Sequence, residues 1–175
     1  MGSVEIRHLA EADAEAYHRV RLRALRDHPD AFGRAYEEAQ SLAEMAEEFR
    51  SRHDGDASFI LGAFAAGELL GTVGCSRERG LKNRHKALIW GMYVAPEARG
   101  RGVGRALLGA AIDRARAWPG LEQLTLAVAV HNQPARALYR DCGFEPFGLE
   151  RRCLKLADRY VDEEHMVLFL ERVPA

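Results

Sequence analysis

Glycine and arginine alternate around position 100 of this 175-residue sequence, and the segment has the residue types to bind a phosphate group. It reads Val94-Ala95-Pro96-Glu97-Ala98-Arg99-Gly100-Arg101-Gly102-Val103-Gly104-Arg105. At a helix start the first backbone amides have no partner within the helix, and the helix dipole adds partial positive charge. A phosphate or diphosphate is therefore the expected ligand, with the arginines supplying further charge. The alternative is a flexible turn with solvated arginines, because a short glycine motif alone is a weak signal.

Two common phosphate-binding motifs are absent from the sequence. A dinucleotide fingerprint that started at Gly100 or Gly102 would need glycine where Arg105 or Leu107 stands. No G-x-x-x-x-G-K-[ST] pattern occurs anywhere in the sequence. The sequence therefore excludes a Rossmann dinucleotide site and a P-loop, and the missing lysine and metal-binding motif argue against a nucleotide phosphotransferase.

A second informative segment follows a predicted strand and has the pattern of a short helix. It reads His131-Asn132-Gln133-Pro134-Ala135-Arg136-Ala137-Leu138-Tyr139-Arg140-Asp141-Cys142-Gly143-Phe144. Asn132 is a good N-cap, and Pro134 is tolerated in the first turn of a helix. Gly143 stands where a helix C-terminus favours a left-handed residue. The buried side of this helix is expected to carry four residues, Ala135, Leu138, Tyr139 and Cys142.

The two segments together resemble the motifs of the GNAT superfamily of N-acetyltransferases. Arg99, Gly102 and Gly104 match the R-x-x-G-x-G signature for acetyl-coenzyme A, and the segment from Asn132 matches N-x-x-A-x-x-L-Y-x-x-x-G-F. Asn132 follows Gly104 by 28 residues, which leaves room for one helix and one strand. The resemblance extends over nearly the whole chain and is weakest over Ala35 to Gly55.

The resemblance implies an α+β fold with one domain over residues 1–175, a mixed central sheet and helices on both faces. It further implies that the sheet splays open between the strands at Ala87 to Val94 and at Leu124 to Val130, and that the pantetheine arm of acetyl-CoA enters this gap. The arm would pair there with exposed backbone like an added strand, which also brings the thioester carbonyl near a backbone amide. The implied cofactor-binding residues are Met92, Tyr93, Val94, Arg99, Gly100, Arg101, Gly102, Val103, Gly104, Arg105, Asn132, Ala135, Leu138 and Tyr139.

Acetyl transfer to an amine needs a proton donor for the departing thiolate. The resemblance implies that the Tyr139 hydroxyl points at the sulfur. A tyrosine has a free pKa of about 10 and can protonate a thiolate whose pKa is roughly 8.5. Tyr139 is therefore the expected general acid, and the alternative is a core aromatic residue at helical spacing.

The reaction also needs a base, because a lysine-like amine has a free pKa near ~10.4 and is protonated at neutral pH. Some relatives have a glutamate on the strand before the asparagine, and the corresponding position in this sequence is Ala127. The candidates are His131, Glu150, Asp162 and Glu163, acting directly or through waters. No H-E-x-x-H motif or Cys/His cluster indicates a metal. Cys142 is a poor candidate for a nucleophile because it lies on the buried side of its helix.

Hydrophobic periodicity predicts the elements that position these segments. Ala87 to Val94 is almost continuously apolar, which is typical of a strand covered on both faces. The predicted strands are Val4 to Leu9, Phe59 to Ala65, Leu69 to Cys75, Ala87 to Val94, Leu124 to Val130 and His165 to Leu170, with extended chain from Phe144. The predicted helices are Ala12 to Asp27, Leu42 to Arg52, Val103 to Ala115 and the one that Asn132 caps.

Composition restricts the partners of the protein. Lysine plus arginine (25) nearly balance aspartate plus glutamate (26), so no overall field favours nucleic acid. The three cysteines form neither a disulfide framework nor a C-x-x-C pair, and no apolar stretch approaches the roughly 18 residues of a membrane helix. These observations favour the cytoplasm, no membrane partner and no metal. The sequence leaves a homodimer open.

The acceptor is an amine that the sequence does not identify, on a small molecule, an antibiotic or a protein N-terminus. Acceptor specificity is expected from the N-terminal helices, including Pro29 to Gly33 and the acidic stretch Glu37 to Glu48. The glutamates could attract a cationic amine, or they form a solvated helix face. The alternative function is a non-catalytic acyl-CoA-binding domain, which only the missing glutamate supports.

Overall fold

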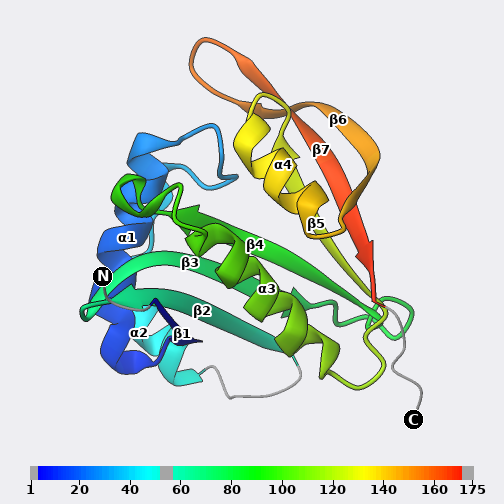
Figure 1. Cartoon of the computed structure of the whole chain (residues 1–175). Coiled ribbons are helices and arrows are strands. Elements are labelled where there is room, and N and C mark those ends of the chain that lie inside the picture. Colours follow the sequence, from blue (N-terminus) through cyan, green and yellow to red (C-terminus); the bar gives the residue numbers. More distant parts are fainter. Residues whose placement is uncertain (1–3, 52–56, 171–175) are drawn as a thin grey trace.

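The computed structural model describes residues 4–51 and 57–170, which form one mixed seven-stranded sheet with helices on both faces (Figure 1). The strand order is β1-β2-β3-β4-β5-β7-β6. The strands are β1 (Glu5–His8), β2 (Ser58–Ala65), β3 (Glu68–Arg77), β4 (Lys86–Val94), β5 (Gln123–Ala129), β6 (Glu145–Lys155) and β7 (Tyr160–Phe169). The helices are α1 (Ala14–Asp27), α2 (Leu42–Ser51), α3 (Val103–Arg116) and α4 (Gln133–Asp141), with 3-10 turns η1 (Glu11–Asp13), η2 (Tyr36–Glu38) and η3 (Pro96–Ala98). The predicted α+β class is confirmed.

Alternation along β2 explains why helices cover both faces. Phe59, Leu61 and Ala63 point to one face, where they join the core beneath α3. Ile60 and Phe64 point to the other face, where they pack with residues of α1 and α2. Because side chains alternate between the two faces of a strand, two separate cores form on one sheet.

The sheet splays open between β4 and β5, as expected. These parallel strands pair only at their beginnings, where Lys86, Ala87 and Leu88 face Gln123, Leu124 and Thr125. Beyond these pairs, β5 and its neighbours β7 and β6 swing away from the first four strands (Figure 1). Among the described residues, the edge of β4 that faces β5 therefore has no strand partner over its second half.

A β-bulge in β4 accompanies this opening. Thr72 of β3 faces Tyr93 and Gly74 faces Trp90, so that two residues of β4 oppose Val73 alone. The bulge includes Gly91, which has a left-handed φ of 61° and whose carbonyl accepts a hydrogen bond from the Thr72 hydroxyl at 3.2 Å. A bulge bends its strand and increases the local twist.

Three expectations about the elements need correction or qualification. β4 is covered on both faces only in part, because Leu88 is 40% exposed, whereas Trp90 packs against the core that includes α1 and α2. The last strand is β7 and starts at Tyr160, five residues before the prediction, and it ends before Leu170. The last residue of the predicted helix at 42–52 lies outside the described residues, as do the ends of the predicted domain at 1–175.

Candidate active site

The glycine-rich turn exposes backbone amides at the start of α3. Gly100 and Gly102 have left-handed φ angles of 72° and 76°, and Gly102 is the N-cap of the helix. The first helical hydrogen bond runs from the Ala106 amide to the Gly102 carbonyl at 3.0 Å. Within residues 4–51 and 57–170, no carbonyl accepts a hydrogen bond from the amides at 102–105. Four amides at a positive helix end are thus available to an anion.

A cleft of about 720 Å³ lies between the second half of β4, the starts of α3 and α4, and the second half of β5. It brings together the expected cofactor-binding residues Met92, Tyr93, Val94, Arg99, Gly100, Gly102, Val103, Gly104, Arg105, Asn132, Ala135, Leu138 and Tyr139. Arg101 is exposed and does not line the cleft. The two sequence segments, which are separated by α3 and β5, therefore meet at one cleft.

Two of the three arginines of the turn contact other protein groups. The Arg99 Nε donates to the Val94 carbonyl at 2.9 Å, and its Nη2 lies 2.9 Å from His28 Nε2. Arg105 forms an ion pair with Asp141 at 2.7 Å. Because these two guanidinium groups are tied to neighbouring elements, the groups of the turn that remain available to an anion are the backbone amides at 102–105 and the exposed Arg101.

Tyr139 lies on α4 with its ring in the core and lines the cleft. The residue is 7% exposed, and its ring contacts Phe144 edge-to-face at a centroid distance of 6.1 Å. Burial raises the pKa of Tyr139 to about 12. The phenol therefore keeps its proton at neutral pH and can donate it, so that Tyr139 is at once a core aromatic residue and a candidate acid.

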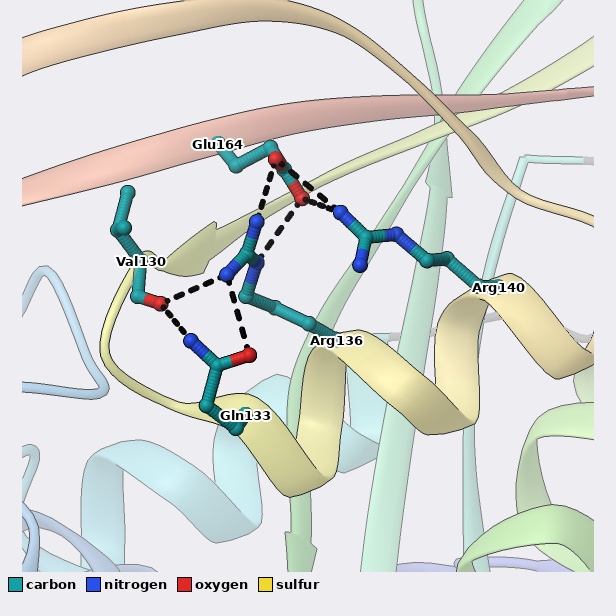
Figure 2. A network of polar contacts seen from close by, with 5 residues as sticks. All are labelled: Val130, Gln133, Arg136, Arg140 and Glu164. Carbon is teal, nitrogen blue, oxygen red and sulfur yellow. Dashed lines mark hydrogen bonds and ion pairs between the residues drawn. The ribbon is translucent and has the colours of Figure 1, made fainter.

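Polar contacts at both ends and along one side fix α4. The Asn132 side chain accepts a hydrogen bond from the Ala135 amide at 3.3 Å, which confirms the predicted N-cap. Figure 2 shows Arg136 held by Glu164 of β7 through two hydrogen bonds of 2.8 and 3.1 Å. Arg136 also donates to the Val130 carbonyl at 3.1 Å, and Arg140 pairs with Glu164 at 3.3 Å. The helix that carries Tyr139 is thus anchored to β7 and to the end of β5.

The structure separates the four candidate bases. His131 lines the cleft, and its Nε2 lies 2.9 Å from a carboxylate oxygen of Asp30. Glu150, Asp162 and Glu163 do not line it. Their carboxylates contact His165 at 3.1 Å, the Arg152 amide at 2.7 Å and the Cys153 thiol at 3.1 Å, respectively. Ala127 lines the cleft, so a carboxylate is absent from the strand position where some relatives have glutamate.

Asp30 is a residue of this site that the sequence did not single out as a partner of His131. Burial alone would raise the pKa of Asp30. The hydrogen bonds from His131 and from Arg159, the latter at 3.3 Å, together outweigh this effect, so that the net pKa lies below the usual range. Asp30 and His131 are 101 positions apart, so only the fold brings them together. The carboxylate is therefore ionised at neutral pH and orients the imidazole.

The N-terminal segments expected to contact the acceptor lie beside the cleft. Asp30, Ala31 and Phe32 line it, together with His28, which the sequence did not indicate. Of the acidic stretch, Glu38 and Glu44 accept hydrogen bonds from the backbone amides of Ala35 and Ser41. These glutamates stabilise helix starts, which is a local role.

No described group of three or more His, Cys, Asp or Glu side chains is arranged to hold a metal ion. Among the helices in the described ranges, none combines the length and apolar character needed to cross a membrane. All three cysteines are free thiols.

Comparisons with known proteins agree with this geometry. The model of the Acetyltransferase (GNAT) family matches residues 17–144. An aminoglycoside N(6')-acetyltransferase type 1 from Stenotrophomonas maltophilia is 34% identical over 150 residues, covering 80% of this chain and 85% of that protein.

Solved structures extend the similarity over almost the whole chain. A ribosomal-protein-alanine N-acetyltransferase from Brucella melitensis has a TM-score of 0.83 at 28% identity, covering 95% of this chain and 99% of that one. A phosphinothricin acetyltransferase from Sinorhizobium meliloti, solved with acetyl-CoA, has a TM-score of 0.79 at 25% identity, covering 95% and 88%. The three proteins are named for three different acceptors. The chain therefore belongs to the GNAT acetyltransferase family and is an acetyl-CoA-dependent N-acetyltransferase.

Proposed function

We propose that the cleft between β4 and β5 holds acetyl-CoA with its diphosphate on the amides at 102–105 and its pantetheine arm along Met92, Tyr93 and Val94. The observation that carries this proposal is the combination of unpaired amides at the start of α3 with the unpaired edge of β4 in one cleft. An added strand supplies hydrogen bonds to such an edge, and a helix start supplies them to a phosphate. Asn132 and Leu138 line the opposite wall.

When bound, acetyl-CoA supplies an acetyl group activated as a thioester. The Tyr139 hydroxyl donates a proton to the sulfur as the carbon–sulfur bond breaks. Its raised pKa, about 12, keeps the donor protonated throughout the neutral range. A backbone amide of β4 stabilises the negative charge that develops on the carbonyl oxygen.

His131 accepts the proton that the acceptor amine loses. With Nε2–H donated to Asp30, the Nδ1 atom carries the lone pair that can take a proton directly or through a water. Asp30 holds the ring in this tautomer and stabilises the imidazolium that forms. The alternative function, a non-catalytic acyl-CoA-binding domain, was supported by the lack of a glutamate base at position 127. The pair of His131 and Asp30 provides a base from another part of the cleft.

The acceptor is a primary amine of a small molecule or of a peptide or protein N-terminus, reached from the side of α1 and α2. The three free thiols support a reducing compartment, and we place the enzyme in the cytoplasm on that basis.

A thiol-release assay with acetyl-CoA and a broad panel of primary amines tests this function. We expect Tyr139→Phe and His131→Gln each to lower kcat by about 10²- to 10⁴-fold, the usual contribution of a general acid or base. Acetyl-CoA affinity, measured by calorimetry, should change little in either variant.

His165→Gln is the matched control, because His165 also pairs with a carboxylate, at 3.1 Å from Glu150, but lies outside the cleft. This variant should retain wild-type turnover. Full activity in His131→Gln would remove His131 from the mechanism, and full activity in Tyr139→Phe would do the same for the phenol.

A further inference from the structure

A second cavity, of about 360 Å³, lies between α1, α2, the loop that joins them, β2 and β4. It adjoins the active-site cleft at two points. Trp90 lines both cavities, and the Arg21 guanidinium of the second cavity lies 4.8 Å from the ring centre of Phe32, which lines the cleft. The two cavities therefore lie side by side, with Trp90 in the lining of both.

Arg21 is a half-buried cation at the boundary between the two cavities. Within residues 4–51 and 57–170 its guanidinium has no hydrogen-bond or ion-pair partner, although it lies against the Phe32 ring. Arg23, two residues along the same helix, shows the contrast, because it makes a two-pronged contact with Glu97 at 2.7 and 2.9 Å. A guanidinium has five N–H donors and stays charged at every physiological pH, so Arg21 has donors available to a ligand.

The charges around Arg21 favour an anionic group. Burial lowers the pKa of Arg21, Tyr17 raises it, and the nearby charge of Arg34 lowers it again, with a net lowering. Arg34 lines the same cavity. The acid in the lining, Glu48, accepts a hydrogen bond from Gln40 at 3.0 Å. A planar carboxylate can bind such a guanidinium through two parallel hydrogen bonds, whereas an ammonium group would be repelled.

The cavity lining combines the polar residues Arg34, Gln40 and Glu48 with buried apolar residues. Met45, Phe49 and Ile60 line it and are 3%, 9% and 5% exposed. A volume near the lower end of typical ligand pockets suits the side chain of a small molecule.

We infer that the acceptor is a free α-amino acid whose carboxylate is bound by Arg21. The carboxylate then lies at the boundary between the cavities, the side chain occupies the second cavity, and the α-amine, attached to the same carbon as the carboxylate, enters the cleft. This inference rests on the proposed function, since the amine must meet the acetyl group in the cleft. Arg21 acts as a specificity-determining residue.

The test compares matched acceptors in the thiol-release assay: L-phenylalanine, L-leucine and L-methionine, their carboxamides, and the aminoglycoside kanamycin. We expect kcat/KM for the free amino acids to exceed that for the carboxamides by about 10- to 100-fold, the effect of a charge-assisted hydrogen-bonded pair. Arg21→Gln should abolish this preference by raising KM for the amino acids, while kcat/KM for the carboxamides stays unchanged.

Arg19→Gln is the matched control, because Arg19 lies on the exposed side of α1 and pairs with Glu15. This variant should keep the preference for free amino acids, and acetyl-CoA binding should be the same in both variants and the wild type. The inference is wrong if the carboxamides or kanamycin are the better acceptors, or if Arg21→Gln keeps the wild-type preference. If the wild-type protein itself does not bind acetyl-CoA, that result would instead overturn the proposed function.

Discussion

The proposed diphosphate site depends on the backbone angle of one residue. Gly102 caps α3 with a φ of 76°, and the residues that follow this left-handed turn, Val103 to Arg105, line the cleft. An L-residue with a side chain is destabilised in this conformation because its Cβ approaches the following carbonyl oxygen. The residue type at position 102 thus affects both the stability of the turn and the direction of the amides.

Gly102→Ala should lower the free energy of unfolding by about 1–2 kcal/mol, the cost of an L-residue in the left-handed region. Relief of that strain turns the amides away from the cleft, so acetyl-CoA binding, measured by calorimetry, should weaken.

Gly109→Ala is the control within the same helix. A Cβ at Gly109 would meet nothing within 4 Å, and its φ is not in the left-handed region. Alanine should therefore raise the free energy of unfolding by about 1 kcal/mol, with acetyl-CoA affinity unchanged. Equal acetyl-CoA affinity in the two variants would contradict the role of the turn.

At the scale of residues, the sequence predicts those parts of the site that are local. Asn132 and Gly143 act at the two ends of α4, and the residues next to them in the sequence determine where this helix begins and ends. Both are found as predicted. Asp30 was not singled out as the partner of His131, because that contact joins residues from the two sides of the cleft. The fixed position of Arg99 was not predicted either, since it depends on His28 at the end of α1.

Among the elements, α4 depends on a polar anchor as well as on its apolar side. Glu164 and Arg136 have side chains only 14% and 15% exposed, and their contact holds the helix against β7 (Figure 2). The hydrogen bonds from Arg136 lower the pKa of Glu164 below its usual 4.5, although burial opposes this. The pair is therefore fully charged at neutral pH.

Glu164→Gln should lower the Tm at pH 7 by about 2–6 °C, because it weakens charge-assisted hydrogen bonds in a half-buried pair. The folded-state pKa of Glu164 is depressed, so its stabilisation is present above pH 4.5 and is lost as the pH falls further. The difference in Tm between the variant and the wild type should accordingly shrink in acid, as scanning calorimetry from pH 7 to about pH 3.5 would show.

Asp113→Asn serves as the control, since the pair between Asp113 and Arg116 is on the surface, with Asp113 76% exposed. Its Tm should change by less than about 2 °C. An equal effect of both substitutions would show that the anchor of α4 is no stronger than a surface pair.

The same anchor explains why the start of β7 was not predicted. Tyr160, Val161 and the three acidic residues that follow lack the alternation of a half-buried strand. The acidic residues face partners instead: Asp162 accepts from the Arg152 amide, Glu163 from Cys153 and Glu164 from Arg136. Their place in the sheet comes from tertiary contacts, which hydrophobic periodicity does not record.

At the scale of the whole molecule, buried groups that lose a proton more easily in the unfolded chain determine how the free energy of unfolding changes at high pH. Burial raises the pKa of the Cys75 thiol from 9.0 to about 12 and that of the Tyr139 phenol from 10.0 to about 12. Both folded-state values lie above the unfolded ones. The stabilisation is therefore complete below about pH 9 and is lost as the pH rises toward 12.

We expect the free energy of unfolding to fall above pH 9, with each group adding at most about 1.4 kcal/mol per pH unit to the slope. Cys75→Ala should be less stable than the wild type at pH 8, because it leaves a cavity in the core, yet should lose less stability up to pH 10.5. Urea unfolding at several pH values measures both effects. Parallel pH profiles for the two proteins would show that Cys75 does not contribute.

Most of the architecture follows from sequence patterns that reflect burial. The alternation along β2 and the helical spacing of Leu107, Leu108 and Ala111 are visible because each element buries one side. The bulge at Gly91 was not predicted, since a glycine within a strand pattern has several uses. The opening of the sheet was implied by family resemblance, because no residue pattern in β4 or β5 records where their pairing ends.

The short pairing between β4 and β5 links ligand binding to the cohesion of the fold. In the part of the chain that the structure describes, three residue pairs between β4 and β5 join the first four strands to the last three along the sheet. A pantetheine arm between these strands would form hydrogen bonds with the backbone groups of β4 that β5 does not pair. The concentration of acetyl-CoA in the cell would then affect the stability of the contact between strands β1 to β4 and strands β5 to β7. The apoenzyme would open first at this seam, and its lifetime against proteolysis would then follow the supply of acetyl-CoA.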